Sequence, residues 1–305
     1  MKIYLNGKIM EAEEAKISVF DRAYLFGEGL FETFRSYGSA PLVPQVPRAL
    51  RAAGGKVPFL DKHLARLEWS TTFVGLPFPH PQTIQKAIFD TLAASKIPDA
   101  RIKVLVSGLN PKTLAPTMPT DDMEINLVVT CEKFNPYSDE DYENGVALVV
   151  IHSVRNEPPP ASNIKSISRL VKMIARKEFS EKEAFDGILL NAEGLVTETT
   201  QSNIFWVTKG TLHTPPTSLG LLAGVTRQII IDLAKEEGIP VSEKIITPEQ
   251  LKKSDEVFIT GSTLEVMPVV AIDEEPIGTG SPGKIAPLLA GAYKERIREE
   301  MASSD

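Results

Sequence analysis

A lysine between two isoleucines is the first residue of this sequence whose surroundings could support covalent chemistry. Lys165 lies in the stretch SNIKSISRL (residues 162–170) and is one of 33 Lys and Arg residues in the chain. Apolar surroundings disfavour the charged form of an amine, and a nucleophilic lysine must be neutral when it attacks. The two isoleucines therefore make Lys165 a candidate nucleophile, provided that other segments bring suitable partners to it.

A carboxylate on a predicted strand is the second candidate group. Glu198 lies in EGLVTETTQSNIFWV (193–207), within a run of threonines that has apolar strand residues on both sides. If this carboxylate is buried, it needs a cation or an N–H donor as its partner. An exposed strand glutamate is the alternative, and the residues alone leave both open.

Three segments could bind an anion such as a phosphate. GVTRQII (224–230) places a glycine before a predicted helix, whose first N–H groups and dipole favour an anion. TGST (260–263) ends a predicted strand with hydroxyls and a glycine. Arg66 lies on a predicted helix one turn from His63, where its planar guanidinium could clamp a phosphate. Each signal is weak alone, because a Gly-Val-Thr helix start is commonly an ordinary N-cap.

Taken together, these groups indicate pyridoxal 5'-phosphate (PLP) as a cofactor. The lysine would form a Schiff base, the glutamate would keep the pyridine nitrogen protonated, and the helix start would hold the phosphate. The sequence contains no Walker A loop, no Rossmann glycine pattern, no HExxH and no GxSxG, and it singles out no acidic pair as a glycosidase dyad. The chemistry must therefore depend on a less standard arrangement.

The composition is that of a globular protein large enough for two domains. The chain has 305 residues, of which 42% are hydrophobic and 24% charged. Its net charge of −7 and the lack of a long basic run argue against a nucleic-acid or anionic-membrane partner. Cys131 is the only cysteine and the four histidines lie far apart, so we expect no disulfide and no metal site. We find no signal peptide and no membrane-spanning stretch, and we expect a cytoplasmic protein.

The order of the predicted elements gives an α+β fold. We predict an N-terminal α+β domain at residues 1–131, a polar linker at 132–145 and a C-terminal domain at 146–305. The segment 39–54 is rich in Pro, Ala and Arg, and we interpret it as a surface insertion at a hairpin tip. Hydrophobic periodicity predicts helices at 60–76, 80–96, 168–183, 226–238 and 285–301, a hairpin around Asn6-Gly7, and strands that include 29–37, 101–108, 123–131, 146–154 and 185–191.

The strand predicted at 29–37 has an unusual face. Phe31, Thr33 and Arg35 alternate with a more apolar set, so that a ring, a hydroxyl and a cation share one side of the strand. A core face seldom has this composition. We therefore predict that this face forms a pocket wall.

Six segments of the chain also resemble one known family: DRAYLFGEGLFETFR, HLARL, NIKSISRL, GLVTETTQSNIF, LLAGVTR and DEVFITGSTLEVMPV. They occur in the family's order and cover nearly the whole chain. The chain thus resembles the class IV (fold type IV) PLP enzymes, which include branched-chain aminotransferases, D-amino-acid aminotransferases and aminodeoxychorismate lyases. The resemblance implies an N-terminal α+β domain, a C-terminal mixed α/β barrel-like domain, a cofactor between them and a homodimer whose active-site loops cross the interface.

The resemblance also implies a role for each matched residue. Lys165 would carry the internal aldimine and move the proton between the substrate α-carbon and the cofactor, and Glu198 would pair with the pyridine nitrogen. The remaining cofactor positions are Arg66, Ser262, Thr263 and the backbone of Val225 and Thr226 around the phosphate, with Leu222 against the ring. Phe31, Thr33 and Arg35 match strand positions that line the substrate side.

Two segments depart from the family pattern. Branched-chain enzymes typically follow the lysine with a Gly-Asn-Tyr-like stretch, whereas this chain has Arg169-Leu170. D-amino-acid enzymes often carry an Arg-x-His carboxylate trap, which is altered or absent here, with Lys112 and Leu114 near those positions. Lys103 lies where lyase-like members also have a lysine, and it could serve a substrate carboxylate. A solvated strand lysine is the alternative for Lys103.

We therefore predict a PLP-dependent amino-acid aminotransferase that acts on a branched-chain or D-amino acid and a 2-oxo acid. Arg35, Lys103 and Lys112 are the candidate carboxylate binders, with Phe31 and Leu222 as apolar walls. An aminodeoxychorismate lyase, in which Lys165 would drive the elimination of pyruvate, is the alternative. A non-catalytic PLP-binding protein is the third possibility, and the presence of both Lys165 and Glu198 disfavours it.

Overall fold

A computed structural model describes residues 1–38, 55–109, 113, 115–120 and 122–303 of the chain. These residues form two compact units. The first unit comprises Met1–Asn135, Lys165–Ser168 and Ile297–Asp305, and the second comprises Pro136–Ile164 and Arg169–Arg296. The insertion predicted at 39–54 and Lys112 lie outside the described residues. The segment predicted as a linker contains a capped helix, α4 (Asp139–Asn144).

The first unit is a five-stranded antiparallel sheet with the order β2-β1-β5-β4-β3. Its strands are β1 (Lys2–Leu5), β2 (Lys8–Glu11), β3 (Gly29–Arg35), β4 (Ala100–Gly108) and β5 (Ile125–Lys133). Its helices are α1 (Arg22–Phe26), α2 (Leu60–Val74) and α3 (Pro81–Ser95). Asn6 and Gly7 take left-handed conformations between β1 and β2, which confirms the predicted hairpin.

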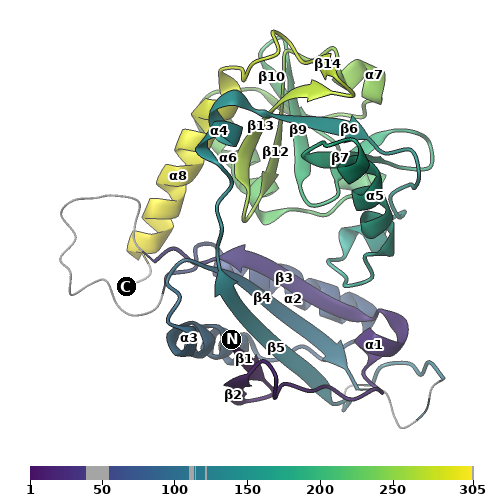
Figure 1. Cartoon of the computed structure of the whole chain (residues 1–305), viewed down its shortest axis with the longest axis vertical. Coiled ribbons are helices and arrows are strands. Elements are labelled where there is room, and N and C mark those ends of the chain that lie inside the picture. Colours follow the sequence, from purple (N-terminus) through teal and green to yellow (C-terminus); the bar gives the residue numbers. More distant parts are fainter. Residues whose placement is uncertain (39–54, 110–112, 114, 121, 304–305) are drawn as a thin grey trace. The chain divides into compact units, whose positions relative to one another are not determined.

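Helices α2 and α3 lie on the same face of this sheet (Figure 1). Each helix turns a periodic apolar row toward the sheet, because residues spaced by three or four positions share a helix face. The buried row of α3 includes Ile84, Ile88 and Leu92, and Ile102 and Val104 of β4 are buried as well. The helices predicted at 60–76 and 80–96 are confirmed.

The second unit is a nine-stranded mixed sheet with the order β11-β10-β9-β12-β13-β6-β7-β8, to which β14 adds beside β13. The pairs β10–β11, β13–β6 and β6–β7 are parallel, and the other pairs are antiparallel. The strands are β6 (Val146–Val150), β7 (Asp186–Leu190), β8 (Val196–Thr199), β9 (Asn203–Thr208), β10 (Thr211–Thr214), β11 (Val241–Glu243), β12 (Glu256–Gly261), β13 (Glu265–Ile272) and β14 (Glu275–Pro276).

The helices of the second unit are α4, α5 (Leu170–Glu181), α6 (Val225–Glu236) and α7 (Pro248–Leu251), with short 3-10 helices at Ala161–Asn163 and Thr217–Leu219. Helix α8 (Ile285–Ser303) contributes to both units. The strands β7 and β9, neither of which is an edge strand, are buried along almost their whole length, as near-continuous apolar runs predict. Ile188, Trp206 and Met267 belong to a core cluster on one side of the sheet, and Phe179 of α5 belongs to a second cluster with Leu189.

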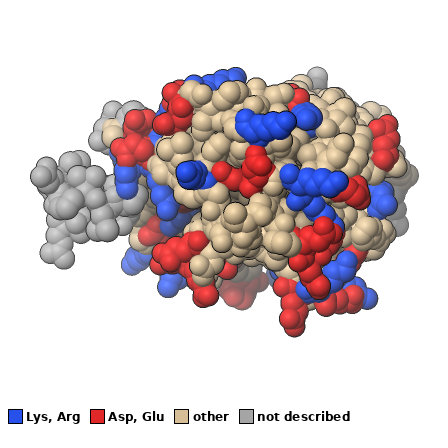
Figure 2. Space-filling view, turned by 90° about the horizontal axis from the view of Figure 1, so that it is seen from above, with Lys and Arg blue, Asp and Glu red and all other residues tan. Residues whose placement is uncertain are grey.

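The surface agrees with the charge pattern of the sequence. On the face shown in Figure 2, Lys and Arg side chains lie among Asp and Glu side chains, without a large basic field. Within the described ranges, no helix is long and apolar enough to cross a membrane. The same residues contain no cluster of His, Cys, Asp or Glu that could hold a metal ion. Burial raises the pKa of the Cys131 thiol to about 12, which makes this cysteine unreactive.

Candidate active site

The backbone around Lys165 extends the sheet of the first unit. The N–H of Phe31 donates to the carbonyl of Lys165 at 2.9 Å, and the N–H of Ile167 donates to the carbonyl of Gly29 at 2.9 Å. These bonds flank an antiparallel bridge between Leu30 and Ser166. A Cβ on Gly29 would lie 2.8 Å from Cδ1 of Ile167 and 2.9 Å from Cβ of Ala23, so a larger residue at this position would force the neighbouring segments to shift.

Two lysine ammonium groups lie near one aromatic ring in this unit. The Nζ of Lys165 is 5.0 Å, and the Nζ of Lys103 4.7 Å, from the centroid of the Phe31 ring. Both distances are in the range of a cation–π contact. Lys103 is also the direct cross-strand neighbour of Thr33. The predicted pocket wall of β3 and the lysine of β4 thus lie on one face of the sheet, together with the side chain of Lys165.

Arg35 lies on the same face, and other residues of the first unit surround its guanidinium. The Cζ atom lies 4.0 Å from the ring centroid of Phe134 and 4.4 Å from that of Tyr37. A nitrogen of Arg35 lies 3.6 Å from a carboxylate oxygen of Asp99. A substrate carboxylate would therefore compete with Asp99 for Arg35. The ammonium of Lys103, by contrast, lies beside the Phe31 ring.

The opposite face of β3 carries a buried carboxylate whose partners the sequence did not reveal. Both oxygens of Glu32 accept hydrogen bonds from Arg66, from Nε at 2.7 Å and from Nη2 at 2.7 Å. The Nδ1 of His63 lies 2.8 Å from Oε2 of Glu32. Burial alone would raise the pKa of Glu32, but Arg66 and His63 outweigh it and hold that pKa well below its usual range.

His63 behaves as a neutral donor in this network. Burial lowers the pKa of His63, although the carboxylate of Glu32 opposes the shift. The contact is therefore an N–H···O bond rather than a full ion pair. Arg66, which the sequence places at a phosphate, uses two of its five N–H groups on Glu32. The two bonds to Glu32 hold the Arg66 guanidinium in one orientation. A phosphate would therefore bind N–H groups of Arg66 other than these two.

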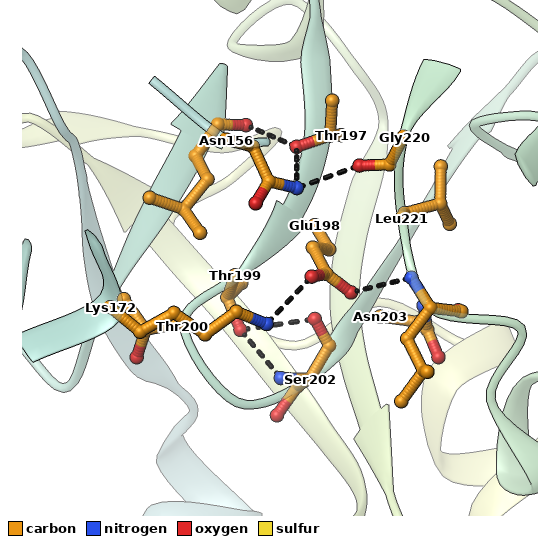
Figure 3. Close-up of polar contacts among 12 residues, drawn as sticks. Asn156, Lys172, Thr197, Glu198, Thr199, Thr200, Ser202, Asn203, Gly220 and Leu221 are labelled. Carbon is orange, nitrogen blue, oxygen red and sulfur yellow. Dashed lines mark hydrogen bonds and ion pairs between the residues drawn. The ribbon is translucent and has the colours of Figure 1, made fainter. Parts of the chain in front are cut away.

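In the second unit, Glu198 of β8 is a buried carboxylate with a different set of partners (Figure 3). Its Oε1 lies 2.8 Å from the Nζ of Lys172, and its Oε2 accepts the backbone N–H of Leu222 at 3.1 Å. Only 4% of the Glu198 side chain is exposed, which excludes the exposed strand glutamate that the sequence left open. Lys172 lies on α5, and sequence reasoning missed it because nothing in the local pattern distinguishes it from a surface lysine.

Three asparagine side chains fix the loop that donates this N–H. Their Nδ2 groups donate to three successive carbonyls: Asn156 to Gly220 at 2.7 Å, Asn163 to Leu221 at 2.8 Å and Asn203 to Leu222 at 2.8 Å. Each bond satisfies a carbonyl of the segment that leads into α6. The loop is thus held in one conformation, with the N–H of Leu222 directed at Glu198.

Helix α6 begins directly after this loop with its predicted glycine. Gly224 is the N-cap, and no side chain of the described residues caps the helix start. A Cβ at Gly224 would collide with the side-chain oxygen of Asn203, so only glycine fits there. The first N–H groups of a twelve-residue helix and its dipole favour an anion. Val225 and Thr226 are buried at this start, and Leu222 is half-buried just before it.

Ser262 and Thr263 lie in the turn after β12 and are half-buried. They belong to the second unit, together with Glu198, Leu222, Val225 and Thr226. Lys165, Arg66, Phe31, Thr33, Arg35 and Lys103 belong to the first unit. The predicted residues thus form two groups, one within each unit: an amine beside an aromatic ring, and a carboxylate beside a helix N-terminus.

The chemistry of the second group fits PLP. A buried carboxylate with acceptor capacity can accept the N–H of a protonated pyridine ring. An uncapped helix start beside a glycine can hold a phosphate through backbone N–H groups. In the first group, an amine that lies near an aromatic ring can supply the nucleophile that such a cofactor needs.

Comparisons with known proteins agree with this chemistry. The family model described as "Amino-transferase class IV" matches residues 29–272. A putative branched-chain-amino-acid aminotransferase of Methanocaldococcus jannaschii is 33% identical over 305 residues, which cover 97% of this chain and 96% of that protein. A D-alanine aminotransferase of Bacillus licheniformis is 28% identical over the whole of both chains. An aminodeoxychorismate lyase of Bacillus subtilis is 31% identical, with 97% of this chain and 94% of that protein covered.

A solved structure shares the whole architecture. A branched-chain amino acid aminotransferase from the organism abbreviated T.th., determined with pyridoxamine 5'-phosphate, superimposes with a TM-score of 0.86 at 28% identity. The match covers 98% of this chain and 94% of that chain. The predicted two-domain α+β fold, with its mixed C-terminal sheet, is confirmed.

Proposed function

Because the chain belongs to the class IV aminotransferase family, we propose that it transfers an amino group between an amino acid and a 2-oxo acid at Lys165. The chain is a PLP-dependent enzyme, as the members of this family are. When bound, PLP accepts the amino group and withdraws electrons from the substrate α-carbon. The contact of Lys165 with Phe31 carries the proposal, because it places the lysine amine on the predicted pocket wall.

Lys165 has two tasks in this proposal. Its Nζ would be the group that holds the cofactor, and the same amine would move the proton at the substrate α-carbon. Both tasks need a neutral amine in a fixed position. The two backbone hydrogen bonds between residues 165–167 and β3 fix its Cα, and the Phe31 ring shields one side of its side chain from water.

Glu198 and the start of α6 would hold the two ends of the cofactor ring system. We assign the ring nitrogen to Glu198 and the apolar contact with the ring to Leu222. The phosphate is assigned to the backbone N–H groups of Val225 and Thr226, with Ser262, Thr263 and Arg66 as side-chain donors. The uncapped glycine start of α6 supports the first part of this assignment.

The substrate carboxylate is assigned to Lys103 before Arg35. Lys103 is exposed on the sheet face of Phe31 and Thr33, and its ammonium lies within cation–π distance of the ring that Lys165 also approaches. Arg35 is stacked on two rings and paired with Asp99, so its charge is partly used within the protein. Phe31 would then provide the apolar wall for a branched or small side chain. Lys112 stays a prediction.

A lyase is the second candidate function. The position of Lys103 favours it, because a second cation beside the reactive lysine suits a substrate with several carboxylates. The Bacillus subtilis relative named as an aminodeoxychorismate lyase is 31% identical, close to the 33% of the aminotransferase relative. In a lyase, Lys165 would drive the elimination of pyruvate without an amino acceptor.

A panel of donors separates these functions. Branched-chain L-amino acids, D-alanine, D-glutamate and aromatic (R)-amines are incubated with 2-oxoglutarate or pyruvate, and the new amino acid is measured. We expect turnover with at least one donor–acceptor pair. Pyruvate release from aminodeoxychorismate without an amino acceptor, together with no transamination of any donor, would show that the protein is a lyase rather than an aminotransferase.

Substitution of the central lysine tests the assignment of the site. Lys165→Ala should reduce turnover to the background and remove the visible absorbance of the bound cofactor, because no other amine takes its place. Lys103→Met is the matched control on the same ring: the absorbance stays, and KM for the carboxylate substrate rises. Retained turnover in Lys165→Ala would refute the proposal.

We also propose that the enzyme is a cytoplasmic homodimer. The first turns of α5 expose Leu170, Met173 and Ile174, whose exposed fractions are 73%, 57% and 41%. A row of apolar side chains on one helix is better placed in an interface than in water. Analytical ultracentrifugation of the holoenzyme should therefore give the mass of two chains, and a monomer at micromolar concentration would rule the dimer out.

A further inference from the structure

The lysine that pairs with Glu198 occupies an electrostatically unfavourable place. Lys172 is the third residue of α5, and Arg169 is the N-cap of that helix. The positive end of the helix dipole disfavours cations there, and the first turn contains no acidic residue to offset it. The partner that offsets this cost is the carboxylate of Glu198 on β8, whose Oε1 lies 2.8 Å from the lysine Nζ (Figure 3).

The two members of this pair differ in their access to solvent. The Lys172 side chain is 27% exposed, whereas that of Glu198 is only 4% exposed. The partly exposed lysine thus places its ammonium group against a carboxylate that is almost fully buried. Leu222 supplies the second donor through its backbone N–H, at 3.1 Å from the other oxygen.

These two donors leave the carboxylate able to accept a third. Each carboxylate oxygen offers two lone-pair sites, and the described residues occupy one site on each oxygen of Glu198. A ring N–H can therefore bind without displacing Lys172. The lysine and the ring would then share one negative charge.

We propose that Lys172 is a positioning residue that shares the Glu198 carboxylate with the ring nitrogen of PLP and sets how firmly that carboxylate holds the ring proton. The inference rests on the proposed role of Glu198. A nearby ammonium neutralises part of the carboxylate charge, so the ring proton is bound less tightly than it would be by an unpaired glutamate. The same ammonium fixes the carboxylate in one orientation, which an unpaired side chain would lose.

Two other charged groups lie near this end of the sheet. Arg169 donates to the carbonyl of Thr200 at 3.1 Å, and Asp186 of β7 accepts the hydroxyl of Thr200 at 2.5 Å. Burial raises the pKa of Asp186, and the threonine hydroxyls oppose that shift. Both groups contact Thr200 in the turn after β8, and neither is substituted in the variants below.

The test measures the proton on the ring directly. Wild-type and variant enzymes are loaded with PLP that carries 15N at the ring nitrogen, and its NMR shift is followed against pH. Lys172→Gln keeps an N–H donor for Glu198 but removes the charge. We expect the pH at which the ring loses its proton to rise by about one unit. Lys172→Arg should restore the wild-type value, and Lys177→Gln, which removes the same charge from an exposed position on the same helix, should not move it.

A second set of variants, built on Glu198→Gln, tests whether Lys172 acts on the ring proton through the Glu198 carboxylate. In Glu198→Gln the carboxylate is absent, so adding Lys172→Gln should shift the titration by far less than it does in the wild type. An equal shift in both backgrounds, or an equal shift for Lys172→Gln and Lys177→Gln, would overturn the inference and leave Lys172 a general surface charge. If Glu198→Gln itself leaves the ring titration unchanged, the assignment of Glu198 fails, independently of Lys172.

Discussion

Glu32 on β3 of the first unit and Glu198 on β8 of the second are both buried, and the two differ in how the fold satisfies them. Glu32 accepts three hydrogen bonds from Arg66 and His63, whereas Glu198 accepts two, from Lys172 and the Leu222 backbone. A carboxylate has about four acceptor sites. Among the described residues, Glu32 is therefore nearly saturated, and Glu198 keeps half of its capacity. A buried carboxylate can act on a ligand only where the fold leaves some of its acceptor sites unused.

The largest effect that this comparison predicts is on the stability of the first unit. Glu32→Ala should lower the free energy of unfolding of the apoenzyme by about 3–5 kcal/mol, because it leaves Arg66 as a poorly compensated buried cation. Urea unfolding measures the change. Glu132→Ala is the control on strand β5 of the same sheet, since Glu132 forms an exposed pair with Arg101. Similar losses in the two variants would show that Glu32 is not a structural anchor.

The matching change in the second unit should affect chemistry rather than folding. Glu198→Gln keeps the shape of the side chain and an acceptor for Leu222, but it loses the charge that stabilises a protonated ring. We expect kcat to fall about 100-fold, with cofactor still bound and with a smaller loss of stability than in Glu32→Ala. Steady-state kinetics and urea unfolding of both variants test the pair. An inactive, unfolded Glu198→Gln beside an active, stable Glu32→Ala would reverse the comparison.

The site residues that could be predicted from the sequence are those with a distinctive local pattern. Lys165 and Glu198 are visible through apolar neighbours, and the start of α6 through its glycine. Their partners depend on tertiary packing, so Arg66 was assigned to a phosphate although its nearest anion is Glu32, 34 positions earlier in the chain. Lys172 and the three loop asparagines have no local signature at all. Which donor meets which acceptor is decided by the register of strands and the rotation of helices.

The helices and strands also divide into those with a distinctive local pattern, which were predicted, and those without one. Long periodic segments such as α2, α3 and α6 were predicted to within a short distance of their ends, because their apolar rows repeat over several turns. The short elements α1, α7, β11 and β14 were missed. One of them carried a usable signal: Thr247 and Gln250 form a capping box at the start of α7, with Pro248 at its first position. Three-residue strands such as β11 carry too little pattern and depend on their neighbours.

A pH dependence should distinguish the two units further. Burial lowers the pKa of His63 below its ordinary value of 6.5. The unfolded chain therefore binds a proton below about pH 6.5 that the folded chain does not, so stability falls as the pH decreases, by up to about 1.4 kcal/mol per pH unit. Glu32 adds a second loss at lower pH: its pKa is depressed, so its contribution is complete above the ordinary value of 4.5 and disappears as pH falls further.

Urea unfolding of the apoenzyme between about pH 7 and pH 5 measures the first of these losses. His63→Gln removes the titrating ring, and we expect a flatter dependence of the unfolding free energy on pH than in the wild type. Its loss of ring contact with Phe34 lowers stability at every pH, so the slope is the quantity to compare. His152→Gln, a change at an exposed histidine, should keep the wild-type slope. Equal slopes for wild type and His63→Gln would exclude His63 as the cause.

The smallest predicted effect concerns the loop that gives Glu198 its second donor. Asn203→Ala removes one hydrogen bond to the carbonyl of Leu222, worth about 1 kcal/mol, and frees the N–H that points at the carboxylate. The affinity of the apoenzyme for PLP should fall about fivefold, as measured by fluorescence titration. Asn191→Ala removes a similar turn contact between β7 and β8, and it should leave that affinity unchanged. Equal affinities for wild type and Asn203→Ala would mean that the loop keeps its conformation, and directs the Leu222 N–H at Glu198, without Asn203.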